Sequence, residues 1–454
     1  MKFFNQLNLK AKKIFVGLKK LTSSEHGKLA VKNSYYTSLT SITSEVTAVF
    51  FTIILARILM PELFGLYNLA LSTILIFTTF SILGTSETTI KFLSQEIGKG
   101  NKGKPESFIR HLSRIKIIIT FLVVIILLFS ANFISHNLYN KPINLALLAG
   151  IAYIIFVSIF NFFLSIFYAL NEVKIVFYKE IIFQVSRIVL VLVGVLFTIK
   201  NYSNDKVLFV IFISLALAYL ISDVYMFSIL KKYFFHKNRK KELKLNEKKR
   251  INNFLFITST IFLSGIFFSY IDKILLGHFV AAEFIGYYSA AFGIVSSVAG
   301  IVSFGSAFLP IFTKMTKKTL NRVIGKTIKI ASLMSIFLFI IILLLSGLII
   351  KILYGSAYLP TIGILELLSP LIIFLPLTSI YLSYFLSREK PKIIAILLII
   401  STIVNILLGY ILASNLLKYG DLAVVYGISI SAIVSQVIYL FGLYYNVKSD
   451  KVTK

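Results

Sequence analysis

The sequence predicts an all-α polytopic membrane protein with twelve transmembrane helices in two six-helix bundles. Hydrophobic residues make up 57% of the 454 positions, and the mean hydropathy of +0.89 lies outside the range of soluble domains. Apolar runs of about 20 residues, the length that crosses a bilayer, recur along the chain. A short motif also occurs once in each half, which predicts that the two bundles are related by a parallel repeat.

The repeated motif is E-x-x-G-x-Y-x-x-A, and its two copies are 221 residues apart. In the first copy, Pro61 precedes the motif at a point where a helix interior cannot continue, so a hairpin is expected between the first two spans. The matched positions are Glu62, Gly65, Tyr67 and Ala70 in the first copy and Glu283, Gly286, Tyr288 and Ala291 in the second.

Six spans are predicted on each side of a basic linker. The first six cover 34–57, 65–87, 115–134, 143–169, 175–199 and 207–230, and the second six cover 254–277, 283–309, 327–350, 361–387, 392–413 and 422–446. The expected organisation is an N-terminal bundle at 34–230, a linker at 231–253, a C-terminal bundle at 254–446 and a tail at 447–454. Residues 1–33 form a basic segment, either a solvated tail or an amphipathic helix on the membrane surface, and the helix is favoured.

The basic residues test this topology. Of the 47 Lys and Arg residues, 39 fall in the termini and every second loop, and the opposite loops hold six. This is the positive-inside pattern, which predicts a multi-pass protein of the cell membrane with both termini in the cytoplasm. It also accounts for the net charge of +29 without a nucleic-acid partner. The opposite loops are short, which leaves no room there for a catalytic domain.

Polar and charged residues inside the spans are the candidate site. Glu45 and Arg187 fall near the middle of their spans, and Ser41 belongs to a polar stripe with Glu45. Asp272 and Lys273 lie in the seventh span, toward its outer end. Ionisable groups in a membrane are costly, so we expect these residues to line a polar cavity between the halves. The alternative is that the stripe makes helix contacts and that Glu45 pairs structurally with Arg187.

Enzyme chemistry is not indicated. The chain has no cysteine, its five histidines lack metal-ligand spacing, and no Ser–His–Asp set or pair of outer carboxylates occurs. A glycine-rich stretch at 98–104 approaches a nucleotide-binding loop, but no strand precedes it. We therefore expect no catalytic residues, no metal and no ATP-driven step.

The motifs resemble a known family. The segment A-R-x-L-x-P-E-x-F-G-x-Y-x-x-A at 56–70 is similar to the first-hairpin signature of the oligosaccharide and polysaccharide flippases of the MOP superfamily. Asp272-Lys273-x-L-L-G, G-x-Y at 286–288 and L-Y-G-x-x-Y at 353–358 resemble further stretches of that family. The resemblance implies two bundles around a central cavity and alternating access. The candidate gating or motif residues are Arg57, Pro61, Glu62, Gly65, Tyr67, Glu283, Gly286 and Tyr288.

The same resemblance implies a substrate. A lipid-linked oligosaccharide on a polyprenyl diphosphate would pass across the cytoplasmic membrane for glycan export, among membrane lipids and possible partner glycan-assembly enzymes. Arg187 would bind the diphosphate, with Glu45, Ser41, Asp272 and Lys273 as further substrate-binding candidates. Cofactors are not expected, although coupling to Na⁺ or H⁺ would supply a driving force. A cation-coupled multidrug antiporter of the same fold is the alternative, and a polytopic glycan ligase or polymerase is a weaker one.

Overall fold

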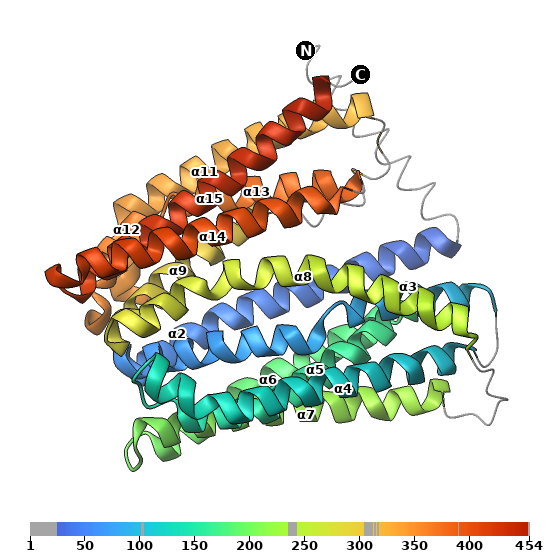
Figure 1. Ribbon diagram of the computed structural model, residues 1–454, viewed down its shortest axis with the longest axis horizontal. Coiled ribbons are helices and arrows are strands. Elements are labelled where there is room, and N and C mark those ends of the chain that lie inside the picture. The colour runs from blue at the N-terminus through green and yellow to red at the C-terminus, as the bar shows by residue number, and fades with distance from the viewer. Residues whose placement is uncertain are drawn as a thin grey trace.

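A computed structural model describes residues 25–100, 104–234, 243–303, 312, 315, 317–388 and 390–452, and within these ranges every long element is a helix (Figure 1). The expected surface helix of residues 1–33 falls largely outside this part of the chain. In the N-terminal half the helices are α2 (Glu25–Ile82), α3 (Thr85–Gly98), α4 (Lys104–Phe133), α5 (Asn144–Ala169), α6 (Val173–Thr198) and α7 (Asn204–Phe234). In the C-terminal half they are α8 (Leu245–Phe279), α9 (Ala282–Val302), α11 (Lys317–Leu353), α12 (Thr361–Leu368), α13 (Leu371–Ser387), α14 (Pro391–Leu416) and α15 (Asp421–Val452).

Element α2 is two helices joined by a sharp reversal. Met60 has φ 58° and ψ 170°, which no helix contains, and Pro61 begins the second helix. Proline suits that first position because it lacks the N–H that would be left unpaired there. The blue ribbon of Figure 1 therefore turns back on itself, as the hairpin prediction required.

The helices accommodate the predicted spans. Ten helices in the described ranges are long and apolar enough to cross a membrane, and the first of them runs from Lys32 to Gly98. This helix provides two crossings because it reverses at Met60. The 35-residue α8 is not among the ten, and it covers the span predicted at 254–277. Spans ten and two are each built of two pieces, α12 with α13 and the second part of α2 with α3.

The bundle has two chemically different ends. One, which we call the lysine-rich end, carries the α5–α6 connection, the last residues of α3, α7, α13 and α15, and the first residues of α2, α4, α8 and α14 (Figure 1). The other, the lysine-poor end, carries the reversal at Met60 and the α4–α5, α6–α7, α8–α9, α11–α12 and α14–α15 connections. The antiparallel order of the helices thus follows the charge pattern of the loops.

The hydrophobic core is shared at one end and divided at the other. One large cluster joins side chains of both halves, among them Phe64 of α2 and Tyr288 of α9. Two further clusters lie toward the lysine-rich end. One, around Phe92 and Phe167, belongs to the N-terminal half together with the first turns of α8, and the other, around Tyr384, belongs to the C-terminal half. The halves are therefore packed together at the lysine-poor end. At the lysine-rich end α8 packs on the N-terminal half, and the later helices of the C-terminal half hold a core of their own.

Candidate functional site

The two copies of the repeated motif meet face to face. A Cβ placed on Gly65 would lie 1.8 Å from the carbonyl oxygen of Ala282, and a Cβ on Gly286 would lie 2.1 Å from the carbonyl oxygen of Pro61. The 221-residue offset of the repeat relates Pro61 to Ala282 and Gly65 to Gly286. The same contact is therefore made twice, with the roles of the two halves exchanged. Only glycine permits this backbone approach, which closes the lysine-poor end.

Further contacts close the same end. The Nε of Arg57 donates to the carbonyl oxygen of Leu353 at 2.7 Å, and its Nη2 donates to that of Ile352. These carbonyls belong to the last turn of α11, where a cation is favoured by the helix dipole. The hydroxyl of Tyr358 donates to the carbonyl oxygen of Ala56 at 2.9 Å. Arg57 and the 353–358 stretch, singled out separately in the sequence, thus form one joint between the halves.

The acidic motif residues contribute little to this closure. Glu62 is exposed, and the amide of Asn204 donates to it at 3.4 Å. Glu283 is also exposed and lies in the first turn of α9, where the helix dipole stabilises a negative charge. Nearby, the Nζ of Lys141 donates to the carbonyl oxygen of Gly277 at 2.7 Å, and burial lowers the pKa of this lysine.

The two motif tyrosines have different surroundings. Tyr67 stacks against Phe212, with ring centroids 5.7 Å apart, inside the N-terminal half. Tyr288 is 1% exposed, and its hydroxyl donates to a carboxylate oxygen of Asp272 at 2.9 Å. The repeat conserves the helix contact but not the chemistry beside it.

A polar network surrounds Asp272. The amide of Asn405 donates to its second carboxylate oxygen at 2.8 Å, and the hydroxyl of Ser431 donates to Asn405 at 2.9 Å. The neighbouring Lys273 donates to the side-chain oxygen of Asn68 at 3.3 Å, a bond from α8 to α2 that joins the halves. Asp272, Asn405 and Ser431, drawn from α8, α14 and α15, thus form one hydrogen-bonded chain in which both carboxylate oxygens of Asp272 accept a hydrogen bond.

Arg187 lies among aromatic rings of the N-terminal half. Its guanidinium carbon is 4.4 Å from the ring centroid of Phe51 and 5.5 Å from that of Phe183. Tyr67, Tyr219, Glu180 and Tyr153 are close enough to interact with it electrostatically. Its Nε and Nη2 are buried and have no hydrogen-bond partner among the described residues. The guanidinium is thus held in place by rings that leave its donors free for another acceptor.

Ser41 and Glu45 line a different cavity. It has a volume of about 300 Å³ and is formed by α2, α5 and α6. Its far wall carries Lys179 and Glu180, an ion pair with a 2.8 Å separation whose lysine side chain is 2% exposed. Lys179 also lies over the ring of Phe160, at 4.1 Å from its centroid.

The predicted pairing of Glu45 with Arg187 is not present. Among the described residues, no ion pair joins them, because the register of α2 against α6 places Phe51 opposite the guanidinium. Glu45 lies six residues earlier on α2, which corresponds to about 9 Å along a helix. The neighbours of Arg187 also all come from the N-terminal half, so the expectation that it faces the space between the halves is not supported.

Sequence reasoning missed two buried lysines. Lys116 and Lys179 were counted with the loops, but Lys116 is 5% exposed and donates to the hydroxyl of Thr85 at 3.2 Å. For Lys179 a signal existed: the turn at Asn171 and the apolar residues from Val173 onward start a helix whose second turn contains it. For Lys116 no local signal distinguishes it from its exposed basic neighbours.

Comparisons with known proteins agree with this architecture. A family model described as polysaccharide biosynthesis protein matches residues 30–316. No protein with a curated description matches the sequence.

Solved structures share the fold. A structure of the lipid II flippase MurJ in an inward closed conformation superposes with a TM-score of 0.70 at 18% identity, covering 89% of this chain and 86% of that one. An inward-facing multidrug resistance MATE transporter of the MOP superfamily gives 0.61 at 14% identity, covering 92% and 96%. The eukaryotic MATE transporter AtDTX14 gives 0.58 at 13% identity, covering 94% and 96%. The chain therefore has the fold of the MOP-superfamily transporters.

Proposed function

We propose that this chain, which belongs to the polysaccharide biosynthesis protein family, is a flippase for a polyprenyl-diphosphate-linked oligosaccharide. It would act by alternating access, without catalysis, in the cytoplasmic membrane. The lysine-rich end would face the cytoplasm, since positive loops are retained on that side. A substrate assembled in the cytoplasm would therefore meet the end at which the core of the later C-terminal helices is separate from the core formed by the N-terminal half and α8.

The observation that carries the transport mechanism is the shared core with the closed glycine contact at the lysine-poor end. An alternating-access carrier needs one end closed while the other admits substrate, and the contact of Gly65 with Gly286 supplies the closed end. Rotating the halves about an axis between them would separate these glycines and bring together the two hydrophobic cores at the lysine-rich end.

Arg187 is the candidate for the diphosphate. A planar guanidinium with free donors binds phosphate oxygens bidentately, which a lysine cannot do. Because Arg187 lies beside the rings of Phe51 and Phe183, the substrate headgroup in this proposal would bind within the N-terminal half. In this proposal Ser41 and Glu45 contact the polar part of the substrate in the neighbouring cavity.

The test uses purified protein in vesicles that contain a fluorescent polyprenyl-diphosphate saccharide. We expect Arg187→Lys to slow flipping about ten-fold or more, because lysine loses one of the charge-assisted hydrogen bonds to the diphosphate. The thermal unfolding temperature should stay unchanged. Arg114→Lys, an exposed position on α4, is the matched control and should flip normally. Normal flipping by Arg187→Lys would remove the diphosphate role.

A cation-coupled multidrug antiporter is the second candidate, and the part-buried Asp272 network favours it. We assign that network to coupling, with Na⁺ or H⁺ as the driving ion. If the chain were a drug antiporter, proteoliposomes should export cationic dyes in exchange for the ion and leave the lipid-linked saccharide in place. A glycan ligase or polymerase would instead lengthen or transfer the saccharide, which mass spectrometry of the recovered lipid detects.

A further inference from the structure

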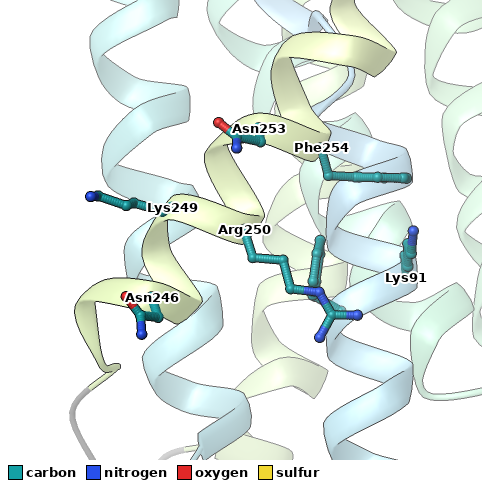
Figure 2. Close-up of a pocket in the computed structure, with 7 residues that line it drawn as sticks. Lys91, Asn246, Lys249, Arg250, Asn253 and Phe254 are labelled. Carbon is teal, nitrogen blue, oxygen red and sulfur yellow. The ribbon is translucent and has the colours of Figure 1, made fainter.

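A basic cavity of about 520 Å³ lies at the lysine-rich end, between α3 and the first turns of α8. Figure 2 shows Arg250 reaching from α8 toward the helix that carries Lys91, and Phe254 pointing at Lys91. The lining residues are Lys91, Phe92, Asn246, Lys249, Arg250, Asn253 and Phe254. Helix α3 belongs to the N-terminal half and α8 begins the C-terminal half, so the cavity is built by both.

Aromatic rings hold the cations of this cavity. The Nζ of Lys91 lies 3.7 Å from the ring centroid of Phe254, and the guanidinium carbon of Arg250 lies 5.6 Å from that of Phe92. The two rings pack edge to face with centroids 5.7 Å apart, and Phe108 stacks beneath Phe92 at 6.0 Å. A ring positions a cation without neutralising it, so both side chains keep donors for an anion.

Among the residues that the structure describes, none that lines the cavity carries a carboxylate. The ion pairs of the described residues are Lys99 with Glu96, Lys104 with Glu247, and Lys179 with Glu180, and none of them uses Lys91, Lys249 or Arg250. Lys91 and Arg250 lie on the same side of α8, whereas Lys249 points to the other side (Figure 2). All three side chains are exposed, so solvent screens their mutual repulsion, and a bound anion lowers it further. The two asparagines add amide donors to the same wall.

The surroundings indicate a membrane lipid. The cavity lies where the apolar run of α8 begins, at the depth of lipid headgroups for a span predicted to start at residue 254. Leu245 is 75% exposed and Phe256 is 73% exposed, on either side of the cavity residues of α8. Apolar side chains flanking a cluster of cations are typical of a surface that contacts anionic lipid.

We propose that this cavity binds the phosphate group of a lipid headgroup in the leaflet at the lysine-rich end and thereby ties α3 to α8. The chemistry is shared by an anionic phospholipid and a polyprenyl diphosphate, and the experiment separates the two. An occupant bound by both helices stabilises the arrangement seen here, in which the first turns of α8 pack on the core of the N-terminal half. The assignment to a phospholipid is independent of the transport proposal, because it concerns what holds two helices together, whereas an assignment to a polyprenyl diphosphate rests on that proposal.

The absence of native cysteine makes the distance between α3 and α8 measurable. Spin labels at Gln95→Cys and Asn252→Cys, both exposed, report it by pulsed electron resonance in nanodiscs. In phosphatidylcholine alone we expect a broad distribution, and addition of phosphatidylglycerol should narrow it to one short distance. The pair Lys91→Gln/Arg250→Gln should need about 30-fold more phosphatidylglycerol, since each basic residue at an anionic surface contributes about a factor of five.

Controls separate a built site from diffuse attraction. The pair Lys231→Gln/Lys232→Gln removes the same charge from the lysine-rich end of α7 and should respond to phosphatidylglycerol normally. Lys91→Arg/Arg250→Lys keeps the charge and should also respond. Equal loss in both glutamine pairs, or a normal response of Lys91→Gln/Arg250→Gln, would overturn the proposal.

The source of the phosphate follows from two soluble probes in phosphatidylcholine nanodiscs. If farnesyl diphosphate narrows the distance distribution at a lower concentration than phosphatidylglycerol does, the cavity is assigned to a polyprenyl diphosphate. If farnesyl diphosphate needs a higher concentration, the cavity is assigned to a phospholipid. Inorganic pyrophosphate lacks the lipid part and should have little effect. If pyrophosphate acts as strongly as the lipids, the cavity binds a soluble phosphate compound and the lipid assignment is wrong.

Discussion

Alanine at either glycine of the motif should open the lysine-poor end. The Cβ of Gly65→Ala would lie 1.8 Å from the carbonyl oxygen of Ala282, and that of Gly286→Ala would lie 2.1 Å from the carbonyl oxygen of Pro61. Both obstructing atoms are backbone, so no side chain can swing aside. Restoring ordinary contact requires the second helix of α2 and α9 to separate by about 1.5 Å.

The cost of that separation falls on one conformation only. Overpacking of a close contact costs about 1–3 kcal/mol, which changes the balance between two conformations by about 5- to 150-fold. The closed state carries this cost and a state open at the lysine-poor end does not. We therefore expect each variant to fold and to populate the open state.

The assay is a distance between Glu62→Cys and Glu283→Cys, both exposed at the lysine-poor end. Spin labels there should show a longer distance in Gly65→Ala and in Gly286→Ala than in the parent chain. Gly293→Ala is the matched control on α9, because its Cβ would meet only the hydroxyl of Tyr354 at 3.7 Å. An unchanged distance in both motif variants would refute the idea that this contact closes the carrier.

Three further outcomes are expected. Cysteine at Lys418 should react with an impermeant maleimide in intact cells, and cysteine at Lys240 in the linker should not; the reverse would invert the orientation. Asp272→Asn should leave folding intact and abolish the dependence of transport on Na⁺ or pH, whichever the parent shows, and a retained dependence would exclude this residue from coupling. Glu247 accepts a hydrogen bond from Lys104, which holds the pKa of the carboxylate below its ordinary range. Its stabilising effect should be present above the unfolded pKa of about 4.3 and be lost as the pH falls through the lower folded value, so melting curves of Glu247→Gln and the parent should converge in acid.

The architecture was readable from the sequence because it rests on local patterns. Span lengths, loop charges and the repeated motif each depend on residues near one another in the chain, and the structure bears out an all-helical, multi-pass protein. The reversal at Met60 also followed from local chemistry, since Pro61 can begin a helix but cannot continue one.

The site was less readable because it depends on helix register. Glu45 and Arg187 both fall near mid-span, but a shift of six residues between α2 and α6 places Phe51 at the guanidinium instead. The periodicity of a sequence predicts which face of a helix carries a side chain. It does not predict which residue of the neighbouring helix lies at the same height. Lys179 shows the same limit at the boundary of a span. The predicted boundary is uncertain by a few residues, and moving it by two helical turns changes this lysine from a solvated charge to a buried ion-pair partner.

Comparison of the two halves position by position shows where the site chemistry resides. The 221-residue offset that relates Gly65 to Gly286 also relates Phe51 to Asp272. At this level the first half holds the cation of Arg187 over the ring of Phe51, whereas the second holds the carboxylate of Asp272. The glycine contact is the same when the two halves are exchanged, so it cannot distinguish an anion from a cation. Its role is to hold the two halves together or to let them separate. Recognition of an anionic headgroup and coupling to a cation need opposite charges, and we infer that they reside at the positions where the repeat is broken.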